Sequence, residues 1–266
     1  MGTVLLIASG KGGVGKSTIS SALAIALSRR DASVCIVDAD IGLRSQDAIL
    51  GVADSVVYDL MDVARKGCNI RQALIHLPGE EDVCLMASSQ FARAKDLDAK
   101  DFTKIVQELR QTFGYVLIDC PAGLERNMRI LTQCEPDEAI AVATPDDVSV
   151  RDVRRLCMVL RERRVNTPKL IVNRLDPLLI SAGEMRSAQE ISDELKLPLL
   201  GEIPEDVHVY RALLTGRRFM DLECEAANAI TRIAARIRGN EVLLPEYGSR
   251  RLSWRERRKL RKLTEV

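Results

Sequence analysis

The sequence predicts an α/β domain built on a doubly wound, mostly parallel sheet with helices on both faces. First, short apolar runs that suit buried strands alternate along the 266 residues with longer segments whose apolar residues recur at helical spacing. Second, hydrophobic residues make up 46% of the chain but aromatic residues only 3%, so aliphatic side chains must fill the core. Third, polar residues and glycines follow several apolar runs, at the sheet edge where such folds bind ligands.

Seven aliphatic runs predict the buried strands. They cover residues 4–9, 34–38, 83–87, 115–119, 139–144, 169–173 and 199–203. Five of the intervening segments show the apolar spacing of helices. They cover residues 17–29, 102–112, 150–163, 184–195 and 223–237. A helix between consecutive strands lets both strands run in the same direction, so we expect most of the sheet to be parallel.

We expect one domain over residues 1–240, a linker over 241–248 and a basic tail over 249–266. The tail contains eight Lys or Arg residues and two Glu, a net charge of +6, whereas the whole chain has a net charge of +1. The residues before the tail therefore carry a net charge of −5. A basic tail on an acidic body implies that the tail has an anionic partner of its own.

The cysteines and the hydropathy pattern favour a cytoplasmic protein. Seven cysteines, an odd number, occur in the sequence, and no two are spaced as CxxC. This argues against a disulfide framework and against a zinc or iron–sulfur site, and it fits a reducing compartment. No run approaches the roughly 18 uncharged apolar residues that a membrane span requires.

A phosphate-binding loop is predicted where the first strand meets the first helix. Gly10, Gly15, Lys16 and Ser17 match the pattern GxxxxGK[ST] in the strand-to-helix context that this motif requires. Glycines let backbone N–H groups surround phosphate oxygens, and the helix N-terminus adds partial positive charge. In this pattern Lys16 reaches the outer phosphates and Ser17 binds Mg²⁺. The predicted nucleotide-binding residues of the loop are Gly10, Lys11, Gly12, Gly13, Val14, Gly15, Lys16, Ser17 and Thr18.

Three aspartates follow strands at the same predicted edge. Asp119 ends an apolar strand, where a carboxylate can hold Mg²⁺ or one of its waters. Asp38 and Asp40 end another strand at that edge. One of these two can support the magnesium site while the other orients an attacking water. The sequence thus predicts phosphoryl-transfer chemistry that uses a nucleotide and Mg²⁺.

Lys11 is a second lysine in the loop, directly after its first glycine. With this lysine, the stretch KGGVGKST resembles the deviant Walker A motif of the MinD/ParA family of ATPases. In that family two monomers enclose two ATP molecules, and the lysine crosses the interface to the phosphates of the partner's nucleotide. The resemblance implies that Lys11 acts in trans, as a cation that stabilises the charge developing during ATP hydrolysis.

The resemblance to septum-positioning members of this family extends from residue 2 to about residue 240. The segments that carry it are 37–51, 56–63, 116–125, 149–155, 172–174 and 201–206. It implies that Lys11, Lys16 and Asp40 are catalytic, with Asp40 positioning the water. It also implies Ser17 as the direct Mg²⁺ ligand, with Asp38 and Asp119 around the ion. Further implied ATP-binding residues are Asn173, Arg174, Pro204, Glu205 and Asp206, of which Asn173 and Asp206 are the implied adenine contacts.

Two residues depart from the family pattern in segments that act as switches. Ser45 stands where members usually have Asn, and Cys120 stands where they usually have Ser. Neither departure removes the ATP chemistry. What these two residues change in the switches is left open by the sequence.

The same resemblance implies what the protein does. We expect an ATPase that forms a homodimer with ATP, binds peripherally to the inner face of the cell membrane and positions the division septum by inhibiting division at other sites. The implied partners are a division inhibitor and a regulator. The sequence leaves open whether that regulator is a MinE-like activator or a static polar anchor.

Other functions within the superfamily use the same loop. A ParA-like ATPase that partitions DNA, which would bind phosphates through a basic surface, is the main alternative, together with a flagellar-number ATPase. The segments IGLR and IPED favour the septum-positioning members. A nitrogenase-type iron protein is disfavoured because most cysteines fall within predicted strands and helices; only Cys134, near a helix end, suits such a cluster.

The tail is predicted to be a basic amphipathic helix that anchors the protein to anionic lipid. Leu252, Leu260, Leu263 and Val266 share one side of a helical projection, and Lys and Arg residues flank them. The apolar side is thin, because Glu256 lies inside it. The single tryptophan, Trp254, projects near the opposite side. A solvated extension, or a tail that docks on the acidic body or on DNA, is the alternative.

Overall fold

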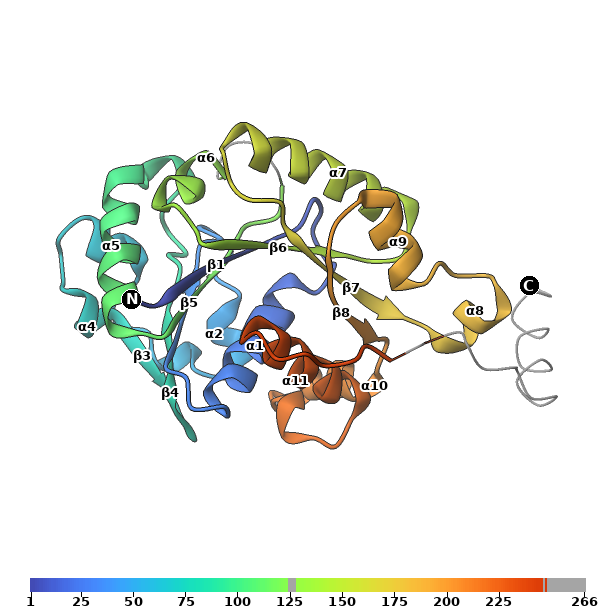
Figure 1. Cartoon of the computed structure of the whole chain (residues 1–266). Helices are drawn as coiled ribbons and strands as arrows, with labels where there is room; N and C mark the ends of the chain where they lie inside the picture. Colours follow the sequence, from blue (N-terminus) through green and yellow to red (C-terminus); the bar gives the residue numbers. More distant parts are fainter. Residues whose placement is uncertain (124–127, 246, 248–266) are drawn as a thin grey trace.

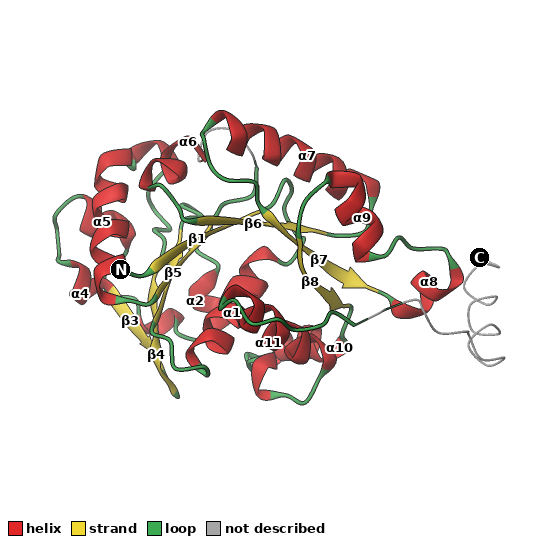
Figure 2. Ribbon diagram, in the orientation of Figure 1, coloured by secondary structure: helices red, strands yellow, loops and turns green. Residues whose placement is uncertain are grey.

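A computed structural model describes residues 1–123, 128–245 and 247. Its centre is an eight-stranded sheet with the order β3-β4-β2-β5-β1-β6-β7-β8 (Figures 1 and 2). All neighbouring strands pair in parallel except β3 and β4, which are antiparallel. The strands are β1 (Thr3–Ala8), β2 (Val34–Asp38), β3 (Leu74–Leu77), β4 (Glu80–Met86), β5 (Tyr115–Asp119), β6 (Glu138–Ala143), β7 (Lys169–Leu175) and β8 (Leu199–Pro204). The predicted mostly parallel sheet is confirmed.

Helices cover both faces of the sheet (Figure 1). One face packs against α5, α7 and α9, and the other against α1, α10 and α11. The longer helices are α1 (Lys16–Ser28), α5 (Ala99–Thr112), α7 (Asp147–Glu162), α9 (Ala188–Leu195), α10 (Val207–Thr215) and α11 (Glu225–Ile237). The short ones are α2 (Gln46–Leu50), α3 (Leu60–Ala64), α4 (Ile70–Ala73), α6 (Met128–Leu131) and α8 (Pro177–Ala182), with 3-10 turns η1 (Ala53–Ser55), η2 (Ala94–Asp96), η3 (Thr132–Cys134) and η4 (Phe219–Asp221).

All seven predicted strands and all five predicted helices correspond to observed elements, with ends that differ by a few residues. No predicted segment corresponds to β3, to α10 or to the short helices α2, α4, α6 and α8. Strand β3 has only four residues and exposes His76, so it shows no continuous aliphatic run. The domain and linker boundaries stay predictions. The predicted tail, with Leu252, Trp254, Leu260 and Leu263, lies outside the described residues.

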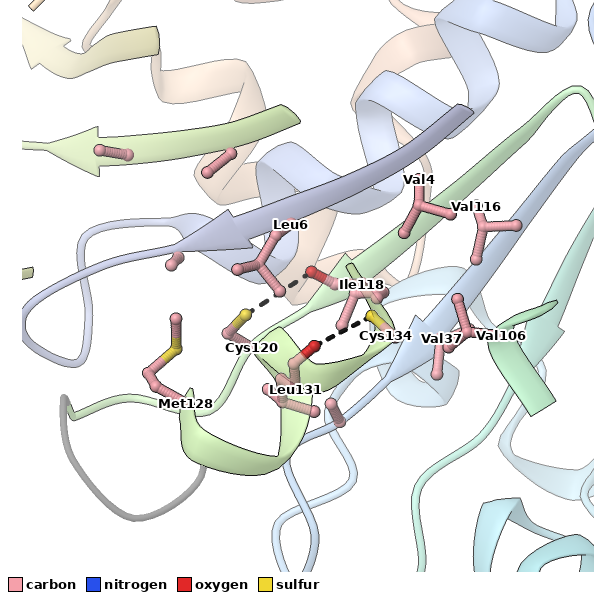
Figure 3. Packing of buried hydrophobic residues seen from close by; sticks show 14 of the residues in the cluster. Val4, Leu6, Val37, Val106, Val116, Ile118, Cys120, Met128, Leu131 and Cys134 are labelled. Carbon is pink, nitrogen blue, oxygen red and sulfur yellow. Dashed lines mark hydrogen bonds between the residues drawn. The ribbon is translucent and has the colours of Figure 1, made fainter. Parts of the chain in front are cut away.

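The sulfur atoms of Cys120 and Cys134 lie inside the core formed by β1, β2, β5 and α6 (Figure 3). The Cys134 thiol donates to the carbonyl oxygen of Leu131 at 2.9 Å. Both cysteines are fully buried, and burial raises the pKa of Cys134 to about 12. A buried, protonated thiol does not suit a surface iron–sulfur cluster, so this cysteine gives no support to the iron-protein alternative.

Among the helices of the described ranges, none combines the length and the apolar character needed to cross a bilayer.

Replacing Phe102 with alanine tests the packing of α5 on the sheet. Phe102 is completely buried, so Phe102→Ala is expected to lower the free energy of unfolding by about 3–5 kcal/mol, through lost burial and a residual cavity. Denaturant unfolding followed by circular dichroism measures the change. The control is Phe91→Ala, because Phe91 is 96% exposed and its removal should cost less than about 0.5 kcal/mol. Equal losses in the two variants would contradict this packing.

Candidate nucleotide-binding site

The predicted phosphate-binding loop joins β1 to α1, and its backbone requires glycine at three positions. Gly13 and Gly15 have φ angles of +80° and +92°, which residues with a Cβ rarely adopt. A Cβ on Gly10 would lie 2.3 Å from the Cβ of Asp152 in α7, so α7 leaves no room for a side chain there. Helix α1 begins at Lys16, directly after the loop, and its N-terminus supplies a partial positive charge that suits phosphate.

A buried ion pair lies at the base of the loop. The Nζ atom of Lys16 is 2.7 Å from Oδ1 of Asp119, and the two side chains are 7% and 0% exposed. Ser20 donates to the same oxygen at 3.1 Å, and the Nε2 atom of Gln46 donates to Oδ2 at 2.7 Å. Because a buried charge is tolerated only when it is paired and hydrogen-bonded, these four side chains form one interdependent network.

Asp38 lies beside Asp119 on the neighbouring strand. Its carboxylate accepts three backbone N–H bonds at 3.0 Å each, from Asp40, Ser45 and Gln46. Burial raises the pKa of Asp38 to about 7; the Gln46 N–H opposes the rise and the Asp119 charge adds to it. Asp38 therefore holds the backbone of residues 40–46 against the end of the sheet.

The predicted metal residues meet at this edge. Oγ of Ser17 accepts from Nζ of Lys16 at 3.3 Å and lies 3.5 Å from Oγ of Ser45, which places it next to the network around Asp119. In the described part of the chain, no three His, Cys, Asp or Glu residues converge as a metal cage. Mg²⁺ usually binds one or two protein oxygens and completes its shell with phosphates and water. The donor set around Ser17 therefore fits Mg²⁺ bound with a nucleotide.

Asp40, the predicted water-positioning residue, is half-buried at the same edge. Burial raises its pKa, the positive charge of Lys16 lowers it and the negative charge of Asp119 raises it. The backbone N–H of Asp40 donates to Oδ1 of Asp38 at 3.0 Å, so Asp40 lies next to the buried carboxylates. Its catalytic role stays a prediction.

Lys11 lies apart from this cluster. Its Nζ atom is 2.9 Å from Oδ1 of Asp146, and the two side chains are 34% and 47% exposed. Asp146 caps the N-terminus of α7 by accepting from the backbone of Ser149. Burial alone would raise the pKa of Asp146, but hydrogen bonds from Thr144, Lys11 and Ser149 lower it to about 2. The two lysines of the loop thus occupy different environments, one buried and one at the surface.

The ATP-binding residues predicted outside the loop, including the adenine contacts Asn173 and Asp206, line a single pocket. Asn173, Arg174, Pro204, Glu205 and Asp206 surround it together with Gly15 and Thr18 of the loop and helix α1. The pocket contains about 610 Å³ of empty space, part of it open to solvent. The remaining walls are apolar or aromatic residues of α1, β8, α10, η4 and α11: Ile19, Ile203, Val209, Tyr210, Leu213, Phe219, Ala226 and Ile230.

Two of the pocket residues are held by specific bonds. The Nδ2 atom of Asn173 donates to the carbonyl oxygen of Val14 at 2.8 Å, so this side chain fixes the loop. Asp206 caps α10 through the backbone N–H of His208 at 2.9 Å and accepts from Ala226 of α11 at 3.2 Å. Its carboxylate therefore holds the pocket walls together.

Sequence reasoning missed Gln46, Ser20 and Asp146, and it missed the pocket walls from α10 and α11. Gln46 lies in a segment that resembled a switch, but its spacing from Asp119 gave no signal of a contact. The walls are ordinary apolar residues whose position depends on how the helices pack.

Comparisons with known proteins agree with this architecture. Residues 1–238 match the ParA family model, described as NUBPL iron-transfer P-loop NTPase. The septum site-determining protein MinD of Helicobacter pylori is 40% identical over 258 residues, which cover 94% of this chain and 96% of that protein. The MinC:MinD cell division protein complex of Aquifex aeolicus aligns with a TM-score of 0.85 and 32% identity, covering 92% of this chain and 99% of that chain.

A MinD structure from Pyrococcus horikoshii OT3, complexed with Mg-ADP, aligns with a TM-score of 0.78 and 27% identity over 89% of this chain and 96% of that chain. Iron transfer belongs to the description of the family model and is not assigned to this chain. The seven cysteines of this chain include no CxxC pair. The identity and the coverage are high enough to assign the protein to a family. The phosphate-binding loop between a strand and a helix agrees with that assignment. The chain belongs to the ParA family of P-loop NTPases and, within it, to the septum site-determining MinD proteins.

Proposed function

We propose that this protein is a Mg²⁺-dependent ATPase that dimerises when it binds ATP and takes part in septum site determination at an anionic membrane. Family membership implies ATPase activity. The names of its relatives, and a related MinD in complex with MinC, support a role beside a division inhibitor. The observation that carries the proposal is the buried pair of Lys16 and Asp119 under a glycine loop that opens into the pocket.

ATP binding would use residues that already lie together. The glycine loop and the N-terminus of α1 would receive the phosphates, and Lys16 would exchange an oxygen of Asp119 for phosphate oxygens. The walls of the pocket, with Asn173 and Asp206 at its polar side, would enclose the adenine. When Lys16 moves from Asp119 to the phosphates, Asp119 would keep its hydrogen bonds from Ser20 and Gln46. Nucleotide binding would therefore change one contact of the buried network and leave the others in place.

Hydrolysis would use the carboxylates at the same edge. Ser17 would hold Mg²⁺ directly, with Asp38 and Asp119 around it. When bound, Mg²⁺ neutralises charge on the phosphates during phosphoryl transfer. Asp40, whose backbone is bonded to Asp38 at the same edge, would orient the attacking water.

Lys11 supports a dimer as the active form. Its side chain is one-third exposed and is bonded to Asp146, outside the network of Lys16, so it is free of the buried site and accessible to a second chain. In an ATP dimer it would leave Asp146 for the partner's phosphates and supply positive charge in trans. Hydrolysis would then require two chains.

The charge distribution supports membrane binding by the tail. The tail carries a net charge of +6 and attracts an anionic surface, while the body of the protein is acidic. One such tail binds weakly, and two tails in a dimer bind well because the second binds at high effective concentration. ATP would thereby control membrane association.

Lys16→Ala is expected to weaken ATP binding by at least about 100-fold, because it removes the charged contact to the outer phosphates. Binding of a fluorescent ATP analogue measures the loss. Lys11→Ala is the matched control and should bind within about threefold of the unmodified protein, since Lys11 acts on the partner. Circular dichroism of both variants checks folding, because Lys16→Ala leaves Asp119 buried without its cation. Tight ATP binding by a folded Lys16→Ala variant would refute the role of this lysine.

Asp40→Ala is expected to accumulate as an ATP-bound dimer, because it keeps the phosphate contacts but loses the water-positioning carboxylate. Lys11→Ala should stay monomeric with ATP, and its hydrolysis should fall by at least about 100-fold. Light scattering gives the mass of each variant with ATP and with ADP. An Asp40→Ala protein whose mass does not change with ATP would be inconsistent with ATP-driven dimerisation.

Truncation after Gly248 is expected to abolish sedimentation with anionic vesicles while ATP-driven dimerisation persists. The full chain should sediment with ATP more than with ADP, and less as salt rises. Omitting Mg²⁺ should abolish hydrolysis in both proteins. A parallel assay with duplex DNA separates the partitioning alternative, which predicts ATP-dependent DNA binding instead. If truncated and full-length chains sedimented equally, the tail would not be the anchor.

A further inference from the structure

Gln46 is a completely buried amide at the first residue of α2, and each polar atom of its side chain has a partner. Its Nε2 atom donates to Oδ2 of Asp119 at 2.7 Å and to the carbonyl oxygen of Ser17 at 3.1 Å. Its Oε1 atom accepts from the hydroxyl of Ser21. Because a carboxylate and a carbonyl can only accept hydrogen bonds, the amide fits this site in one orientation.

The segment before Gln46 is closed on Asp119 at both of its ends. At the start, the backbone N–H of Ala39 donates to the carbonyl oxygen of Asp119 at 3.0 Å. At the end, the Gln46 side chain donates to the carboxylate of the same residue. Residues 40–45 therefore form a loop that one residue of β5 holds at both ends. We call it the Asp40 loop, because Asp40 is its first residue.

The Asp40 loop is tight and contains one strained residue. The backbone N–H groups of Leu43 and Arg44 both donate to the carbonyl oxygen of Asp40, at 3.1 and 3.2 Å. Arg44 has a φ angle of +46°, in the left-handed region that residues with a Cβ rarely adopt. Such a conformation persists only where its surroundings hold it. Loss of the Gln46 contact would therefore let the loop relax and would move Asp40.

The Gln46 side chain also joins the Asp40 loop to α1. Ser17 and Ser21 lie one turn apart on α1, and the amide is bonded to both. Helix α2, which Gln46 starts, lies beside α1 (Figure 1). One buried amide thus connects α1, the end of β5 and the loop that carries Asp40. Gln46 is not among the residues that line the nucleotide pocket, so its influence on the site passes through these neighbours.

We propose that Gln46 is a positioning residue for ATP hydrolysis, which holds the Asp40 loop on Asp119 and thereby keeps the Asp40 carboxylate where it can orient the attacking water. This inference rests on the proposed ATPase activity and on the proposed role of Asp40, and it adds a residue that acts through another. ATP binding depends on the phosphate-binding loop and the pocket. Loss of the Gln46 amide should therefore slow hydrolysis and leave the affinity for ATP nearly unchanged.

The first experiment separates hydrolysis from binding in the full chain with Mg²⁺. Gln46→Met keeps a side chain of similar length but removes the amide. It should lower kcat at least about tenfold, while Kd for a non-hydrolysable ATP analogue stays within about threefold. With ATP it should accumulate as a dimer, as expected for Asp40→Ala. The matched control is Gln189→Met, because Gln189 is exposed on α9, where it is bonded to Asp193; this variant should behave as the unmodified chain.

Ser21→Ala is a milder change at the same contact. It leaves both donors of the Gln46 amide in place and removes the bond to Oε1, so the amide is held less firmly. It should lower kcat by about twofold to fivefold, and adding it to Gln46→Met should cause little further loss, because the two changes remove one interaction. Circular dichroism checks the folding of each variant. If Gln46→Met did not fold, Ser21→Ala would decide the question.

Amide hydrogen exchange tests the Asp40 loop without nucleotide. The backbone N–H groups of Leu43, Arg44 and Ser45 are hydrogen-bonded in the nucleotide-free protein. In Gln46→Met they should exchange at least about fivefold faster than in the unmodified chain, because the loop opens more often. In Gln189→Met their exchange should be unchanged.

An unchanged kcat in folded Gln46→Met would overturn the role of Gln46 and leave the ATPase proposal intact, provided that the unmodified chain is active. A Kd that rises in proportion to the loss of kcat would assign Gln46 to nucleotide binding and overturn it as well. A Gln46→Met protein that stays monomeric with ATP would do the same in favour of dimerisation. No hydrolysis by the unmodified chain would instead refute the ATPase activity on which this inference rests.

Discussion

The ion pair between Lys16 and Asp119 is the interaction on which the rest of the site depends. Its two side chains are almost completely buried, so each charge needs the other and its hydrogen bonds. Asp119 joins the end of β5 to α1 through Ser20 and to the segment after β2 through Gln46. Because Lys16 starts α1 and follows the glycine loop, this pair holds the phosphate-binding backbone against the central strands.

The same ion pair separates the environments of the two lysines in one loop. Lys16 points into the protein, toward the buried carboxylate of Asp119, whereas Lys11 lies at the surface against Asp146. Asp146 also caps α7, and α7 leaves no room for a side chain at Gly10. The position of Lys11 is therefore tied to the helix that packs on the loop. Movement of Lys11 toward a partner would release a carboxylate at the start of α7.

The pocket lies on the face of the sheet that α1, α10 and α11 cover. Asp206 belongs to the pocket, yet its carboxylate is engaged by the backbone of α10 and α11. The pocket is thus shaped by how these two helices are held, and α10 contributes apolar residues both to the pocket and to solvent.

Sequence by itself determined the element types, the parallel sheet and the loop motif, because these follow from local periodicity and from glycine positions that a turn requires. It also identified Asp38, Asp40 and Asp119, since parallel strands bring their carboxyl ends to one edge. Only the tertiary structure decided the contacts: Gln46 meets Asp119 across 73 residues and Lys11 meets Asp146 across 135. The exposure of apolar side chains on α10 could not be predicted from the sequence either, because apolar residues at helical spacing predict a buried face. Which residues meet, and which face stays open, depends on the order of the strands and the packing of distant helices, and no local pattern encodes either.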